Sequence, residues 1–347
     1  MKIFKKEEIS QELSDLWQKI KDKGFTRSSL LEIIKTIPPL QKKAWKELLK
    51  IGATNDDLRE IMIVAEPLRN KAWRQLLLQH PTSYDFKDVL EYVEPLRKKA
   101  WHRLFWHGAT NLELCDIIRY VKSYRKQAWR KLIWQGITDD DLVYLIIHVS
   151  DLRDTAWERL KNDNPDAEDF YNIMNLVESL RWEAWHVFEK NKPTNEYLRK
   201  IIVNIVDLRD DAWEEFLRIG PDNYNLLMIM RDVPELRYRA WEVFENNKPN
   251  NEDLRFIIKN IELLRDLAWK KLLEQQVTSK DLCMIIKDVP SLANKAWQRL
   301  KKHELTKDDL IFIMKYSEEL KREAQILFDE FEKKSVKEDV MAEFRKI

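Results

Sequence analysis

The chain has 347 residues, of which 35% are charged, yet its formal net charge at pH 7 is only +1. Total charge therefore identifies no class of partner, and only the distribution of charge along the chain can. No run of about 18 apolar residues occurs, which excludes a membrane-spanning helix. The Lys/Glu-rich start, residues 1–12, lacks the apolar stretch of a secretory signal.

The first expected element is an N-terminal capping helix within residues 1–25, and it carries the first member of a tryptophan series. Eleven of the fourteen tryptophans recur with a period of 28 residues. A fixed period between about 20 and 50 residues is typical of repeat proteins, in which each unit buries its apolar face only against its neighbours. The series is Trp17, Trp45, Trp73, Trp101, Trp129, Trp157, Trp185, Trp213, Trp241, Trp269 and Trp297.

A first helix is predicted in each unit, because a helix-capping residue type stands nineteen residues before each tryptophan from Trp45 onward. These residues are Thr26, Thr54, Thr82, Thr110, Thr138, Asp166, Thr194, Asp222, Asn250 and Thr278, followed by Thr306. An acidic residue usually stands three positions later, as in Asp57 and Asp281, which predicts a capping box.

A second helix contains the pattern Leu-Arg-x-x-Ala-Trp, whose apolar residues form one stripe at helical spacing. All five glycines lie seven residues after a tryptophan of the series, where a left-handed residue ends a helix. Two helices per unit predict an all-α fold, an α-solenoid superhelix of about eleven repeats over residues 26–330. Residues 331–347 are expected to form a charged C-terminal helix or tail.

The second helix also resembles a known repeat family. Leu208-Arg209-x-x-Ala212, followed by Phe216, is similar to the Val-Arg-x-x-Ala-x-x-Leu core of HEAT-like repeats. The resemblance covers roughly residues 26–330. It implies that the second helices line a concave face, and it carries over no functional residue. The unit is shorter than usual HEAT units, and Trp fills a position that is usually small.

Three regular features are expected to be structural. The tryptophan series falls on the apolar stripe and is predicted to form the core. The arginines four residues earlier, such as Arg209, are predicted to make inter-repeat hydrogen bonds to carbonyls or carboxylates. The two cysteines, Cys115 and Cys283, occupy the same place in units six repeats apart, too far for a disulfide. Unpaired thiols favour a reducing, cytoplasmic setting.

The solvent-facing positions of the second helices carry the strongest functional signal. In the first four units they are almost uniformly basic, whereas the middle units are acidic around residues 210–215. Two tryptophans outside the series lie within the basic stretch. The candidate binding residues are Lys42, Lys43, Lys46, Lys71, Arg74, Lys98, Lys99, His102, Arg103, Trp106, Lys126, Arg130, Lys131 and Trp134.

Three interpretations of this basic stretch remain open. It can be an ordinary solvated face, a surface for an acidic protein or peptide, or a nucleic-acid surface, because aromatic residues among Lys and Arg are typical of single-strand binding. We expect a non-catalytic scaffold that binds a macromolecule along its concave face, the alternative being a nucleic-acid-binding solenoid. No membrane partner is expected, and the oligomeric state is left open.

Signatures of enzyme chemistry are missing from the sequence. All five glycines end helices, so none remains for a phosphate-binding loop. The six histidines are scattered, and none is spaced with cysteine as a metal site. We therefore expect no catalytic residues, no cofactor and no metal. A remote alternative, resembling the HEAT-like DNA glycosylases, requires an acid beside an exposed aromatic cleft.

Overall fold

The computed structural model describes residues 2–163, 165–191, 193–303 and 305–344, with side chains described between residues 11 and 333 of these ranges. Within them the protein is all-α, with 23 α-helices and no strand. The predicted tandem array of HEAT-like two-helix repeats is confirmed: α1 (Lys2–Asp22) precedes eleven consecutive helix pairs.

The first helices are α2 (Arg27–Thr36), α4 (Asn55–Val64), α6 (Ser83–Tyr92), α8 (Asn111–Tyr120), α10 (Asp139–His148), α12 (Ala167–Leu176), α14 (Asn195–Asn204), α16 (Asn223–Asp232), α18 (Asn251–Asn260), α20 (Ser279–Asp288) and α22 (Lys307–Tyr316). The second helices are α3 (Gln41–Ile51), α5 (Arg69–Leu78), α7 (Arg97–His107), α9 (Arg125–Gln135), α11 (Arg153–Leu160), α13 (Arg181–Lys190), α15 (Arg209–Ile219), α17 (Arg237–Asn246), α19 (Arg265–Glu274), α21 (Pro290–Leu300) and α23 (Lys321–Phe344). The chain divides into two compact units, Met1–Pro165 and Asp166–Ile347.

The predicted capping boxes form, and they also join neighbouring repeats. At α20, for example, Thr278 Oγ1 accepts from the Asp281 amide at 3.2 Å, while Asp281 accepts from the Thr278 amide at 3.0 Å. The same carboxylate accepts 2.8 Å from Asn251 Nδ2 and pairs 3.0 Å with Arg255 of the preceding first helix. One acidic side chain therefore caps the start of its own helix and joins that helix to the preceding repeat.

The arginine series of the second helices is structural, as expected, but its main bond stays within one repeat. In Arg209, Nε donates 2.9 Å to the carbonyl of Ile202, seven residues earlier, and so satisfies one of the last carbonyls of the first helix. The guanidinium also reaches an acid of the following repeat, Glu235, at 3.6 Å. A short 3₁₀ turn, absent from the sequence prediction, connects most helix pairs; Val206–Leu208 is one example.

The tryptophan series forms most of the core, as predicted, with eight of its eleven members buried. Trp17, Trp101 and Trp129 are half-buried and depart from that prediction. Trp101 and Trp129 lie on the neighbouring helices α7 and α9, where the interface between second helices is open to solvent. Apart from Trp17 on α1, the exceptions therefore lie at one place on the molecule.

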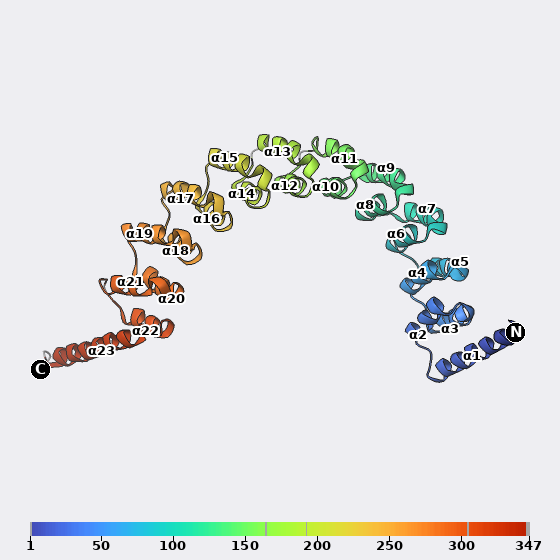
Figure 1. Ribbon diagram of the computed structural model, residues 1–347, viewed down its shortest axis with the longest axis horizontal. Coiled ribbons are helices and arrows are strands. Elements are labelled where there is room, and N and C mark those ends of the chain that lie inside the picture. The colour runs from blue at the N-terminus through green and yellow to red at the C-terminus, as the bar shows by residue number, and fades with distance from the viewer. Residues whose placement is uncertain (1, 164, 192, 304, 345–347) are drawn as a thin grey trace. The chain divides into compact units, whose positions relative to one another are not determined.

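The second helices of the first unit do not line a concave face, so that part of the sequence prediction is wrong. Neighbouring first helices, α4 to α10, contact one another closely, whereas neighbouring second helices, α5 to α9, approach less closely. Figure 1 shows α4, α6 and α8 on the inner side of this unit's bend and α5, α7 and α9 on the outer side. Each of these second helices carries an indole of the tryptophan series, whose bulk favours a wider spacing between neighbours.

Candidate macromolecule-binding surface

The predicted binding residues all lie on four neighbouring second helices of the first unit: α3, α5, α7 and α9. The regular 28-residue period places the same side of each helix toward solvent. Thirteen of the fourteen side chains are exposed, and Lys131 is half-buried. The structure therefore gathers them on one surface, which we call the basic face.

The cations of the basic face lack internal partners. None of its eleven lysines and arginines forms an ion pair with any residue that the structure describes. These eleven are Lys42, Lys43, Lys46, Lys71, Arg74, Lys98, Lys99, Arg103, Lys126, Arg130 and Lys131. The second helices α15 to α19 differ, because Arg239 pairs with Glu214 at 3.0 Å and Lys271 with Glu245 at 3.1 Å. The charge of the basic face is therefore uncompensated and available to a ligand.

Exposed apolar side chains accompany these cations, at the C-terminal end of each helix. Leu78, Trp106 and Trp134 occupy the same position in three successive second helices and are 74%, 75% and 78% exposed. Large apolar side chains that are this exposed and this regular are more often functional than accidental. We call these three residues the apolar row.

Helix geometry places the cations beside the apolar row rather than among it. Each helix carries basic residues at its N-terminal end, such as Lys98, and about one turn later, such as Arg103. The apolar residue follows three residues further on, as Trp106 does on α7. At about 1.5 Å rise per residue, the two levels of cations lie roughly 5 and 11 Å from the apolar row along the helix axis. The surface therefore has a basic side and an apolar side.

An open groove of about 660 Å³ lies between α7 and α9, within the apolar row. Seven residues line it: Trp101, Phe105, Trp106, Gln127, Arg130, Lys131 and Trp134. A smaller hollow of about 400 Å³ continues on the other side of α9 and shares Arg130 with the groove. The half-buried tryptophans of the series, Trp101 and Trp129, line these two hollows, which explains their exposure.

Lys131 joins the two sides of the groove. Its ammonium lies 4.6 Å from the centre of the Phe105 ring on α7 and 4.3 Å from the Trp134 ring on its own helix. Two cation–π contacts hold this lysine against the indole face. No cation covers the Trp106 ring in the same way. Among the aromatic residues described, its nearest neighbours are Phe105 and His102, with ring centres 5.7 Å and 6.4 Å away.

Sequence reasoning missed five residues that shape this surface: Leu78, Trp101, Phe105, Tyr124 and Gln127. Tyr124 carries the clearest signal, because every other repeat from Leu40 to Leu292 has leucine at that position. Its ring packs 5.5 Å from Trp101, and it is half-buried rather than buried. Leu78 could have been found by placing the apolar residues of successive repeats in register.

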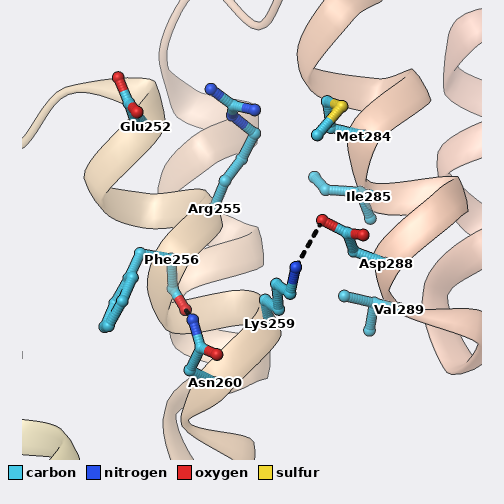
Figure 2. A pocket seen from close by; sticks show the side chains of 9 residues that line it. All are labelled: Glu252, Arg255, Phe256, Lys259, Asn260, Met284, Ile285, Asp288 and Val289. Carbon is cyan, nitrogen blue, oxygen red and sulfur yellow. Dashed lines mark hydrogen bonds and ion pairs between the residues drawn. The ribbon is translucent and has the colours of Figure 1, made fainter.

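A second hollow, of about 380 Å³, lies between the first helices α18 and α20 of the second unit. Figure 2 shows Lys259 directed at Asp288 across it, and the two groups are 3.0 Å apart. Arg255, which also lines this hollow, pairs 3.0 Å with Asp281. Both cations that line this hollow are thus paired, so it lacks the unpaired cations of the basic face.

Two further properties of the described residues bear on function. None of the described helices combines the length and apolar content needed to cross a bilayer. Among the described side chains, no group of three or more His, Cys, Asp or Glu residues is placed to hold a metal ion. In comparisons with known proteins, no family model and no curated protein matches the chain.

Proposed function

We propose that this protein is a non-catalytic scaffold, without a cofactor, that binds an acidic protein through the basic face and the apolar row. The observation that carries the proposal is the combination of eleven cations without acidic partners on four neighbouring helices and three highly exposed apolar side chains on three of those helices. Uncompensated charge steers an oppositely charged partner, and exposed aromatic residues provide the anchoring contacts.

Two features of the apolar row favour a protein partner over nucleic acid. Leu78 extends the apolar row but has no aromatic ring on which a base can stack. One face of Trp134 is covered by the Lys131 ammonium, which a stacked base would have to displace. A single-stranded nucleic acid remains the second candidate, because Trp106 is exposed among unpaired cations. The two buried thiols support a reducing, cytoplasmic location for either function.

The proposal is tested by capturing partners from a lysate on the immobilised protein, with and without nuclease. The comparison variant reverses Lys98, Lys99, Arg103, Lys126, Arg130 and Lys131 to glutamate. Because these side chains serve no ion pair within the described chain, the helix content measured by circular dichroism should not change. We expect acidic proteins to be retained by the parent after nuclease treatment and lost from the variant. Partners that disappear with nuclease alone would favour the nucleic-acid function instead.

A further inference from the structure

The arrangement of the basic face restricts the shape of its partner. The two levels of cations and the apolar row run side by side across α5, α7 and α9, perpendicular to the helices. A partner that follows the array must therefore present apolar side chains along one edge and acidic side chains along the adjacent edge. This inference rests on the proposed function and makes the partner more specific.

The spacing of the apolar row matches that of side chains along a helical partner. Packed neighbouring helices lie about 8–10 Å apart, and these second helices approach less closely than the first helices do. The three members of the apolar row, one on each second helix, therefore recur at about 10 Å or slightly more. In an α-helix, residues i and i+7 lie on one side and about 10.5 Å apart. Large apolar residues at i, i+7 and i+14 would then meet Leu78, Trp106 and Trp134 in turn.

An extended segment could match the same spacing, but the basic face offers little to its backbone. Three amide side chains lie among the solvent-facing positions of α5, α7 and α9: Asn70, Gln75 and Gln127. They occupy three different positions in their repeats and so form no ladder of backbone partners. A helix satisfies its own amides and carbonyls internally and needs no such ladder.

We propose that the basic face binds an acidic amphipathic helix of about four turns. Its large apolar residues lie at i, i+7 and i+14 and contact the apolar row. Its acidic residues lie on the flank that faces the N-terminal ends of α5, α7 and α9, where the cations lie. An acidic residue of the helix pairs with the Lys131 ammonium where it lies, and the apolar residue at i+14 packs on the part of the Trp134 ring that this ammonium leaves uncovered.

The inference is tested with labelled synthetic peptides and the full-length protein, by fluorescence anisotropy. The probe has 22 residues, with leucine or phenylalanine at i, i+7 and i+14 and glutamate along one flank. The control peptide differs only by a proline at a central, solvent-facing position, which breaks the helix while keeping the length, the charge and the apolar residues. We expect the helical peptide to bind at least about tenfold more tightly. Trp106→Ala or Trp134→Ala should weaken binding of the helical peptide by a similar factor.

Other outcomes separate the inference from the proposed function. Equal binding of the helical and proline peptides would overturn the helical partner and leave an acidic protein partner in place. Binding of the helical peptide that is indifferent to Leu78→Ala, Trp106→Ala and Trp134→Ala would also overturn it. A single-stranded DNA of equal charge that binds more tightly than both peptides, through the same tryptophans, would overturn the proposed function as well.

Discussion

Removing one buried tryptophan tests the repeat packing most sharply, and Trp213→Ala is the clearest choice. Trp213 is 1% exposed, and its ring lies 5.8 Å from Phe216 and 5.5 Å from the guanidinium of Arg239, on the following second helix. An indole buries about 200 Å², which at about 25 cal/mol per Å² corresponds to roughly 5 kcal/mol. Alanine retains part of this burial, and the site relaxes, so we expect a loss of about 3–5 kcal/mol.

The loss is measured by urea unfolding followed by circular dichroism, with Trp134→Ala as the matched control. Trp134 is 78% exposed, so the same substitution there should change stability by less than about 0.5 kcal/mol. Hydrogen exchange should show weaker protection in α13 and α17 as well as α15, because repeats are stabilised through nearest neighbours. Equal unfolding midpoints for the two variants would refute the buried-ladder account.

Three further predictions concern single positions. His80→Gly and Lys248→Gly should each raise the unfolding free energy by about 0.5–1 kcal/mol in thermal melts, because these residues adopt φ of 49° and 53° where other repeats have glycine. Burial raises the pKa of the Cys115 and Cys283 thiols to about 12 from 9.0, so both should resist thiol reagents at pH 8. The folded state retains these protons, so stability should fall as pH rises from about 9 toward 12 in pH-dependent unfolding. Asp281→Ala should lower the free energy of unfolding, measured in urea, by about 2–3 kcal/mol, because the carboxylate accepts hydrogen bonds from two neighbouring repeats.

The local structure could be predicted because its causes lie within a few residues. The cap at Thr278 depends on Asp281 three positions later, and the helix stop at Gly52 on the freedom of glycine at φ 99°. The stripe that buries Trp213 depends on helical spacing alone. Such features repeat with the period, and so each unit supports the interpretation of the others.

The shape of the site could not be predicted in the same way. Which row of helices lies on the inner side depends on how side chains fill the space between neighbours, and pattern alone does not give those volumes. The partial exposure of Trp101 follows from that spacing. Leu78 was missed because a single exposed leucine is ordinary. Its meaning depends on the structure, which shows it as exposed as Trp106 and Trp134 on neighbouring helices.

The central claim is that one particular basic surface, rather than positive charge in general, binds the partner. The most direct measurement compares two matched triple reversals to glutamate in quantitative capture of nuclease-resistant acidic proteins. One triple is Lys98/Lys99/Arg103 on α7, and the other, the α21 triple, is Lys295 and Arg299 on α21 with Lys302 in the turn that follows it. Each triple changes two lysines and one arginine, all exposed. We predict that the α7 triple lowers the captured amount at least about tenfold and that the α21 triple leaves it within about twofold. Equal losses in both variants, or none in the α7 triple, would contradict the account.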